Sequence, residues 1–498
     1  MWRFSLIIAL ISVFAVPALS HPASSVNVAS GSAIYRDLDA LEVMGLIPSS
    51  LLSTRPISRL EALRLLFEAE YCLQTLTGRK KERASAVIKR LERELSGELE
   101  KTGAFIVKPV DRAYAQFLYA GSAPHFPSVN NNGDEFKEGP NARAGFAFTA
   151  EALGAFSIYL NPEYRLDDGS RIELKTGYAE ADLWGLEVEA GRDSLWWGPG
   201  YHGSLILSDN AEPFDMLKAT SQRPFLLPWI FRSLGPMRPT IFLATLEDDR
   251  DFPNASLFGM RLAFKPAPAF EVAISRVLLF GGDGREGLGA GDLMGLFIAA
   301  DDAEHSSSSI DGDQIASIDF SYIFTGENAF LPFSSMKLYG EIGAEDSSGD
   351  TKTPTSKAYL AGALVDEPFL FENMSLRVEW AQTSRWDRLG DRAWYRHHIY
   401  TDGYTYNGRV AGHHMGSDAI DLFLRAEYRF QGGTIIGVEA DFERSEVHTS
   451  DQKMAWYAVD IEYQAKDNII LKAGVGSEES DEEGEGGVAG WTGIEYSF

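Results

Sequence analysis

The chain has 498 residues, 45% of them hydrophobic, and carries a formal net charge of −27 at pH 7. So negative a protein is not expected to bind nucleic acid, because a phosphate backbone attracts surfaces rich in lysine and arginine. Its one cysteine, Cys72, excludes an internal disulfide. We assign the acidity to solvated loops, with a divalent-cation role for those loops as the alternative.

Residues 1–20 predict a cleaved secretory signal peptide. Arg3 gives a short positive region, residues 4–16 are apolar, and residues 18–20 (Ala-Leu-Ser) form a small-x-small cleavage site. The apolar stretch is too short and too close to the N-terminus to favour a membrane anchor, and no later segment is apolar for long enough to be a spanning helix. The mature chain is therefore expected to begin at His21.

Residues 33–100 carry a helical pattern. Leucines recur near 3.6-residue spacing, Ser58 and Glu61 have the spacing of a capping box, and Gly78 suits a C-terminal stop. The apolar faces are expected to pack together as a small soluble bundle. Three helices are expected, within residues 35–48, 58–78 and 80–100.

From Tyr114 onward the hydrophobic period changes to two. In the stretch MSLRVEW, apolar side chains alternate with Arg377 and Glu379, and the stretch RIELKTGYA places Ile172, Leu174 and Tyr178 on one face. Strict alternation with full charges on one face is typical of a membrane barrel with a polar lumen. Hydrocarbon admits a sheet only when it is closed, because open edges would leave backbone groups unsatisfied. Two further segments with this pattern are 421–430 and 434–443.

The links between these segments alternate in length. Short links such as 431–433 alternate with long ones such as 385–417, which is typical of bacterial outer-membrane proteins. The alternation fails once, between residues 192 and 248, and the strand count is odd, whereas single-chain barrels have an even number. One further strand repairs both faults. We place it at 224–234, with its prolines near the strand ends or at a bulge.

The chain ends GIEYSF, in which Ile494, Tyr496 and Phe498 alternate. This ending resembles the terminal signal by which outer-membrane barrels are recognised for assembly. The sequence therefore predicts a mainly β fold, a transmembrane antiparallel β-barrel of about 18 strands in the outer membrane of a Gram-negative cell. The barrel is expected over residues 109–498, after the helical bundle over residues 21–108.

Two aromatic, glycine-rich stretches lie on long links of this barrel. The first, residues 194–205, reads SLWWGPGYHGSL, and the second, residues 394–419, reads WYRHHIYTDGYTYNGRVAGHHMGSDA. Together they resemble the Wzi family of capsule-assembly outer-membrane proteins. The residues that carry the resemblance are Trp196, Trp197, Gly198, Pro199, Gly200, Tyr201, Gly203, Ser204, Leu205, His397, His398, Ile399, Tyr400, Asp402, Gly403, Tyr404, Met415 and Gly416.

The resemblance implies a surface lectin that holds capsular or related acidic polysaccharide on the outer membrane, without catalytic residues. It also implies that the helical bundle closes the periplasmic mouth. The other expected partners are outer-membrane lipid and, during biogenesis, the barrel assembly machinery, and the protein is expected to be a monomer. The acidic loops carry no family signature that would identify the glycan.

The residues themselves fit sugar binding without requiring it. Sugars stack on aromatic rings, while charged and amide groups fix their hydroxyls and carboxylates. The alternative is that both links fold into the lumen and pack on each other, and we favour this structural role for Trp196, Trp197, Gly198, Pro199, Gly200 and Tyr201. The predicted polysaccharide-binding residues, expected to be exposed, are Tyr395, Arg396, His397, His398, Tyr400, Asp402, Tyr404 and Arg409.

Enzyme and metal functions fit less well. Ser194 or Ser204 near His202 lacks a nucleophile elbow or a spaced Ser/His/Asp pattern. Adjacent histidines usually diverge, so we expect no metal and no cofactor. The histidines and acids weighed as metal ligands are His397, His398, His413, His414, Asp402 and Asp418.

A diffusion channel is the rival function from another class. An eighteen-stranded barrel is wide enough to conduct, so the strand count does not choose. The charges expected to face the lumen would line such a pore, or would fill it as a network of ion pairs. They include Arg171, Glu173, Lys175, Arg377, Glu379, Arg425, Glu427, Arg429, Glu439 and Asp441.

Overall fold

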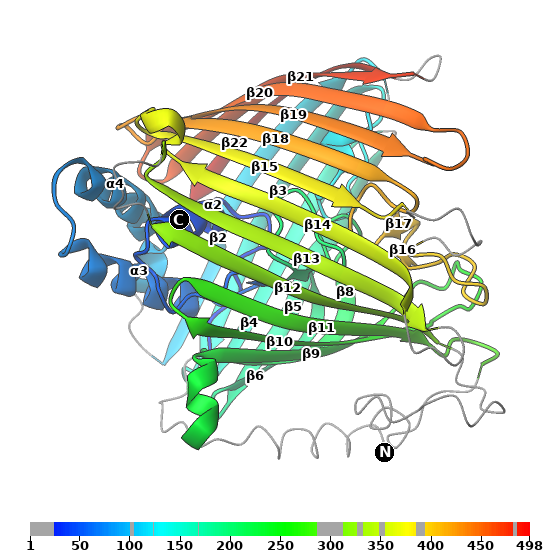
Figure 1. Ribbon diagram of the computed structural model, residues 1–498, viewed down its shortest axis with the longest axis horizontal. Helices are drawn as coiled ribbons and strands as arrows, with labels where there is room; N and C mark the ends of the chain where they lie inside the picture. Colours follow the sequence, from blue (N-terminus) through cyan, green and yellow to red (C-terminus); the bar gives the residue numbers. More distant parts are fainter. Residues whose placement is uncertain are drawn as a thin grey trace.

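The chain folds as a closed antiparallel barrel with helices seated in one mouth (Figure 1). This computed structural model describes residues 24–99, 104–122, 124–167, 169–285, 312–325, 332–347, 354–384, 394–481 and 486–498. The predicted signal peptide lies outside the described residues. Among the described residues, no helix has both the length and the apolar character needed to cross a membrane.

The barrel contains eighteen strands, which confirms the predicted number. Each strand pairs with its neighbour along the chain, and the pairing of the first and last strands, with Phe117 opposite Thr492, closes the wall. The strands are β2 (Phe105–Ala120), β3 (Gly139–Ala152), β4 (Phe156–Leu166), β5 (Ser170–Leu183), β6 (Leu186–Asp193), β8 (Phe214–Ser221), β9 (Met237–Thr245), β10 (Ser256–Ala267), β11 (Phe270–Phe280), β12 (Asp313–Thr325), β13 (Ser335–Ser347), β14 (Pro354–Asp366), β15 (Met374–Gln382), β18 (Ile420–Arg429), β19 (Ile435–Ser445), β20 (Gln452–Lys466), β21 (Ile469–Ser480) and β22 (Gly486–Ser497).

The wall is apolar outside and charged inside, as the alternation predicts. Ile172 is 78% exposed on the outer surface, whereas Arg377 and Glu379 are buried in the lumen. The prediction that Tyr178 shares the outer face is wrong, because a β-bulge intervenes. Asn161 pairs with Thr176 and Pro162 with Leu174, so one residue of β5 is left over and Tyr178 turns inward.

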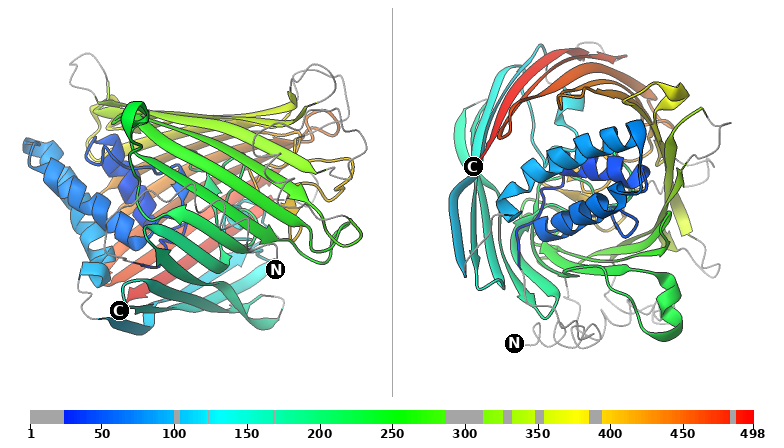
Figure 2. Two further views of the ribbon diagram at one scale, coloured as in Figure 1. Left: turned by 90° about the horizontal axis from the view of Figure 1, so that it is seen from below. Right: turned by 90° about the vertical axis from the view of Figure 1, so that its left-hand side faces the viewer.

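The strand predicted at 224–234 is also wrong. The missing strand is β8, and residues 229–234 form the short 3-10 helix η2 (Trp229–Leu234), which lies outside the wall at the end of the barrel that holds the helices (Figure 2). Prolines 224 and 228 lack the N–H groups that a ladder needs. Trp229 is 89% exposed, and an aromatic ring at the rim of a membrane barrel is typical of the interfacial girdle.

The helices are α2 (Ala33–Val43), α3 (Arg59–Leu73), α4 (Gly78–Glu94) and α5 (Ser96–Leu99). The Ser58 hydroxyl accepts the Glu61 N–H, so the capping prediction for the start of α3 is confirmed. Gly78 does not end that helix. With a left-handed φ of +60°, it turns the chain at the start of α4, because only glycine adopts this conformation at no steric cost.

Buried ion pairs fasten α2 to the inner wall of the barrel. Asp39 lies 3.2 Å from both Lys337 of β13 and Arg377 of β15. Glu42 lies 2.6 Å from Lys337 and 2.9 Å from Lys265 of β10. Burial alone would raise the pKa of both acids, but the lysines and Arg377 hold each pKa below its usual range. The carboxylates are therefore charged at neutral pH.

Candidate functional site

Two links on the side opposite the helices fold inward and fill that half of the lumen. They are residues 194–213, between β6 and β8, and the described residues 383–384 and 394–419 of the link between β15 and β18. Their apolar side chains form one buried cluster with inward-facing residues of the wall. Its largest fully buried members are Trp197, Trp394 and Tyr400.

The paired tryptophans meet the N-terminal region at the centre of the barrel. They form β7 (Trp196–Trp197), which pairs with β1 (Thr54–Arg55) in a small separate sheet. Both rings are buried, and Trp197 packs edge-on against Phe242 of the wall. This burial is what the packed, structural interpretation of the motif requires, and it joins elements that enter from opposite mouths.

The turn after the tryptophans is bound by a carboxylate of the wall. Glu379 accepts the main-chain N–H groups of Tyr201 at 2.7 Å and of His202 and Gly203 at 3.0 Å. Successive N–H groups that converge on one anion form a backbone nest. A Cβ added at Gly203 would collide with the ring of His413, which explains the glycine there. The sequence placed Glu379 in the lumen but gave no sign of this anchoring role.

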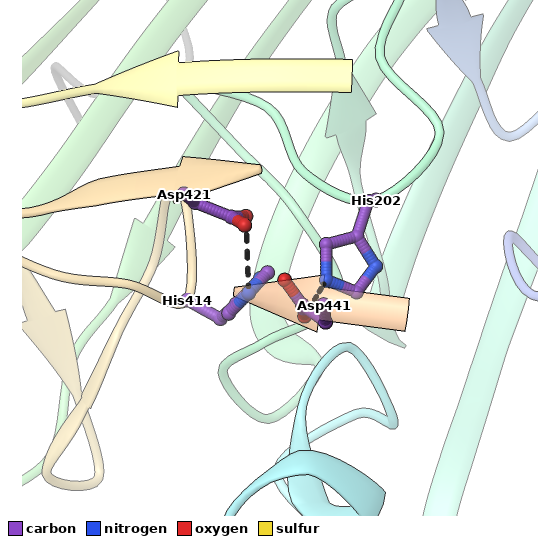
Figure 3. Close-up of side chains that lie close together, drawn as sticks. All are labelled: His202, His414, Asp421 and Asp441. Carbon is purple, nitrogen blue, oxygen red and sulfur yellow. Dashed lines mark hydrogen bonds and ion pairs between the residues drawn. The ribbon is translucent and has the colours of Figure 1, made fainter. Parts of the chain in front are cut away.

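His202 and His414 bring the two inward links together against β18 and β19 (Figure 3). His202 Nε2 lies 2.6 Å from Asp441, and His414 Nε2 lies 3.6 Å from Asp421. Burial lowers the pKa of His414, whereas for His202 the effect of burial is outweighed by Asp441, which raises the pKa.

The histidines and aspartates that the sequence offered as metal ligands do not lie together in the structure. His397 and His398 lie on the outward turn of the link, apart from the buried His413 and His414. Asp418 pairs with His448, and Asp402 accepts the main-chain N–H of Asp251 at 2.6 Å. The acids near His414, Asp421 and Asp441, lie on strands β18 and β19 instead. The alternation of side chains along a strand shows which of them face the lumen, but it does not show which loop residue they meet.

The three tyrosines predicted to bind polysaccharide are buried, so the expectation that their rings are exposed is wrong. Tyr395 and Tyr404 are 2% exposed and Tyr400 is 0% exposed. Each hydroxyl donates to a main-chain carbonyl, that of Leu205 at 2.7 Å, of Ile206 at 3.0 Å and of Gly281 at 3.1 Å, respectively. A buried tyrosine hydroxyl needs such a partner, and the bonds to Leu205 and Ile206 fix the two inward links to each other.

The polar members of the predicted set divide by exposure. Arg396, His398 and Asp402 are exposed, and His397 is half-buried beside them. We call residues 396–402 the outer turn. Arg409 is half-buried and donates to the carbonyls of Ser128 and Asp134, at 2.5 and 3.2 Å. Arg409 thus holds a neighbouring link.

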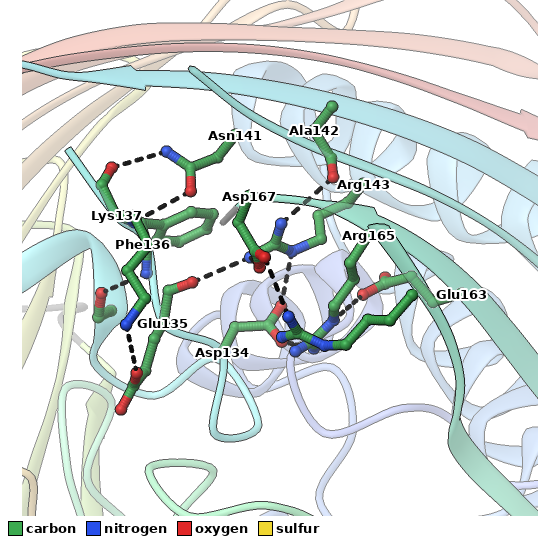
Figure 4. A network of polar contacts seen from close by, with 12 residues as sticks. Asp134, Glu135, Phe136, Lys137, Asn141, Ala142, Arg143, Glu163, Arg165 and Asp167 are labelled. Carbon is green, nitrogen blue, oxygen red and sulfur yellow. Dashed lines mark hydrogen bonds and ion pairs between the residues drawn. The ribbon is translucent and has the colours of Figure 1, made fainter. Parts of the chain in front are cut away.

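That neighbouring link, between β2 and β3, is a third element bound to the inner wall (Figure 4). Asp134 forms ion pairs with Arg165 of β4 and, at 2.6 Å, with Lys175 of β5. Arg143 donates to the Glu135 carbonyl at 2.9 Å. Because these cations neutralise the acids of the link, it is held by charge where the aromatic links are held by apolar packing.

Two large cavities lie between the inward elements in the part of the chain that the structure describes. One, of about 560 Å³, lies beside β2, β5 and β22 and is lined by aromatic and charged side chains. The other, of about 890 Å³, lies beside α4 at the helix mouth and is strongly basic. Its arginines include Arg36, Arg79, Arg83, Arg90, Arg377 and Arg429.

Comparison with known proteins links this architecture to one family. The model of the family described as capsule assembly protein Wzi matches residues 111–483. A Klebsiella pneumoniae protein described as an uncharacterized 55.8 kDa protein in the cps region is 29% identical over 204 residues, which are 40% of this chain and 38% of that protein. That match covers well under two thirds of the relative.

A solved structure of Wzi from Escherichia coli has the same fold. It superposes with a TM-score of 0.74 at 20% sequence identity, over 95% of this chain and 100% of that chain. That protein is described as an outer-membrane protein involved in group 1 capsule assembly and as a carbohydrate-binding β-barrel.

Proposed function

The chain belongs to the family of the capsule assembly protein Wzi, and we propose on that premise that it holds capsular or related acidic polysaccharide on the outer surface of the outer membrane. The exposed outer turn, residues 396–402, supports this proposal and indicates which residues contact the polysaccharide. Arg396 and His398 are exposed there, at the mouth opposite the helices, above a core that fixes the turn from below.

The physical basis is charge and repetition. Arginine offers paired N–H donors to the carboxylates of acidic sugars, and histidine adds a further donor. Each contact is weak, but a polysaccharide presents the same acidic group many times. Multivalency therefore makes the polymer bind more tightly than a single sugar. The buried tyrosines then serve to position the outer turn, and sugar does not stack on their rings.

The test replaces the two exposed cations together. In cells carrying Arg396→Ala with His398→Ala, more polysaccharide should be released into the medium, measured against the amount that stays on the cells. Heat-modifiable migration of the barrel reports assembly in the same samples. Arg444→Ala is the matched control, because Arg444 is an exposed arginine at the same end of the wall, paired with Asp451 at 2.7 Å.

Full retention by the assembled double variant would contradict the assignment of the outer turn. Full retention in cells that lack the whole protein would contradict the polysaccharide function itself.

We propose that the function involves no covalent chemistry. Two serines near His202 were weighed as nucleophiles, and both donate elsewhere: Ser204 to the Trp197 carbonyl, and Ser194 to Asn132 Oδ1 at 2.7 Å. His202 itself faces Asp441. A serine hydrolase would need a serine hydroxyl in contact with the imidazole.

We also propose that residues 21–108 act as a plug in the periplasmic mouth, and that the mature barrel is a lipid-embedded monomer inserted by the assembly machinery. The ion pairs of α2 with the wall support the plug. The lumen charges argue against the rival channel, because Arg425 contacts Glu427, Glu439 and Asp460 at 2.7 to 2.8 Å. Residues 105–108 belong to β2, so the test deletes residues 21–99, which should raise single-channel conductance if the bundle closes the mouth.

A further inference from the structure

Four side chains that commonly bind metals meet inside the lumen. His202 and His414 come from the two inward links, and Asp421 and Asp441 come from the adjacent strands β18 and β19 (Figure 3). One nitrogen or oxygen atom from each lies within 4.8 Å of those of the other three. The two imidazole rings are in edge-to-face contact, with their centroids 4.6 Å apart.

The carboxylates of this cluster lack the cationic partners found elsewhere in the lumen. Among the described residues, Asp421, Asp441 and the neighbouring Glu443 form ion pairs only with histidines. By contrast, Asp319 faces Arg261 at 2.7 Å. Three adjacent buried carboxylates without lysine or arginine are costly, because like charges repel strongly where water is excluded.

Two carboxylate oxygens in the cluster are buried and have no hydrogen-bond partner within the described part of the chain, Oδ1 of Asp421 and Oδ1 of Asp441. Nε2 of His414 lies 2.9 Å from Oε1 of Glu443. Both imidazoles are largely buried, with the side chain of His414 0% exposed and that of His202 13% exposed. The second group of close carboxylates, Asp134, Glu163 and Glu173, differs because Arg165 contacts all three.

We propose that His202, His414, Asp421 and Asp441 bind one divalent transition-metal ion, with Zn²⁺ as the best-fitting occupant. Two imidazole nitrogens and two carboxylate oxygens are a ligand set that zinc accepts in tetrahedral geometry. Calcium and magnesium prefer an all-oxygen set. The ion ties both inward links to the wall, so it fixes the base on which the outer turn stands.

The surroundings already orient the ligands. The Asn130 amide donates to the His202 carbonyl at 2.5 Å. His202 stacks on Phe423 of β18, with centroids 3.9 Å apart. Such second contacts restrict ring rotation, and they typically change metal affinity by about 10- to 100-fold when removed.

The test uses the full-length mature protein, purified in detergent without a histidine tag, stripped with a chelator and then supplied with Zn²⁺. Elemental analysis after desalting should find about one zinc ion per chain, as for a closed four-ligand site. His202→Gln and Asp441→Asn should each weaken zinc binding by more than about tenfold. His448→Gln is the matched control, because that histidine also faces an aspartate, Asp418, but lies outside the cluster.

Heat-modifiable migration checks that each variant is assembled. Anomalous diffraction at the zinc edge provides a measurement that needs no variant, with a single peak expected between the four side chains. Substoichiometric zinc in the wild-type protein, or equal binding by assembled His202→Gln and Asp441→Asn, would overturn the proposal. Polysaccharide retention is not the readout, so failure here leaves the assignment of the outer turn untouched.

Discussion

The two halves of the lumen are filled by different physical means. At the helix mouth, a separate bundle faces the wall through charges, and Asp39 and Glu42 of α2 meet Lys337, Arg377 and Lys265. At the opposite mouth, links continuous with the wall pack as an apolar core. In that half, tyrosine hydroxyls and the Glu379 carboxylate bond to main-chain groups.

The difference indicates which half is able to change. Buried ion pairs are undone by a proton or by loss of one partner, since the remaining charge is then uncompensated. Apart from the His202–Asp441 pair and its neighbours, the opposite half is an apolar core with hydrogen-bonded hydroxyls, which has no such trigger and is disrupted by loss of volume. We therefore expect the bundle to be the half that is released, and the aromatic links to be the permanently ordered support of the outer turn.

The strongest test of the core is Trp197→Ala. Trp197 is fully buried, and removing so large a side chain is expected to cost about 3–5 kcal/mol in the free energy of unfolding. The chemical unfolding midpoint in detergent and heat-modifiable migration measure the loss. Trp229→Ala is the control, because that ring is exposed and its loss should leave the midpoint unchanged. A stable Trp197→Ala barrel would show that the links pack independently of the wall.

Acid should release the bundle while the barrel stays closed. The pKa of Asp39 and of Glu42 is lower in the folded state than in the unfolded chain, so their contribution to stability is present above the ordinary carboxylate pKa of about 4 and is lost as the pH falls further. Conductance in planar bilayers should therefore stay low from neutral pH down to about 4 and rise below it.

Glu42→Gln should raise conductance already at neutral pH, because it weakens bonds to charged groups worth about 2 kcal/mol. If the conductance of the wild-type protein already rises at a pH well above the ordinary carboxylate pKa, a group other than Asp39 and Glu42 releases the bundle when it titrates.

The smallest expected effect is that of Tyr404→Phe. This variant loses the hydroxyl that bonds to the Ile206 carbonyl at 3.0 Å, at a cost of about 1 kcal/mol in the free energy of unfolding. Polysaccharide retention should be unchanged, because the ring stays buried. If polysaccharide retention falls while the unfolding midpoint is unchanged, Tyr404 contacts glycan. The link then both packs the lumen and binds polysaccharide through the same residue.

Local patterns account for the parts of the fold that could be predicted. The Ser58 hydroxyl caps α3 by accepting the N–H of Glu61, three residues further along. Arg377 and Glu379 face the lumen because side chains alternate along any strand. β8 was missed for the same reason. Its inward side chains begin with Phe214 and Met216, which pack on the aromatic links, so the alternation of apolar and charged faces is weak over the first half of the strand.

The sequence alone determined the closed barrel, its even strand number and the family. A hydrophobic period of two, alternating link lengths and short motifs are visible along the sequence itself. They do not depend on which distant residues come together in the fold. Only the tertiary structure decided that Tyr395, Tyr400 and Tyr404 point into the core, and that His202 and His414 meet Asp421 and Asp441. The reason is physical: an amphipathic ring or an imidazole suits both solvent and interior. Its place is fixed by partners that lie far away along the chain, as with Tyr395 and Leu205, which come together only when the wall closes around both links.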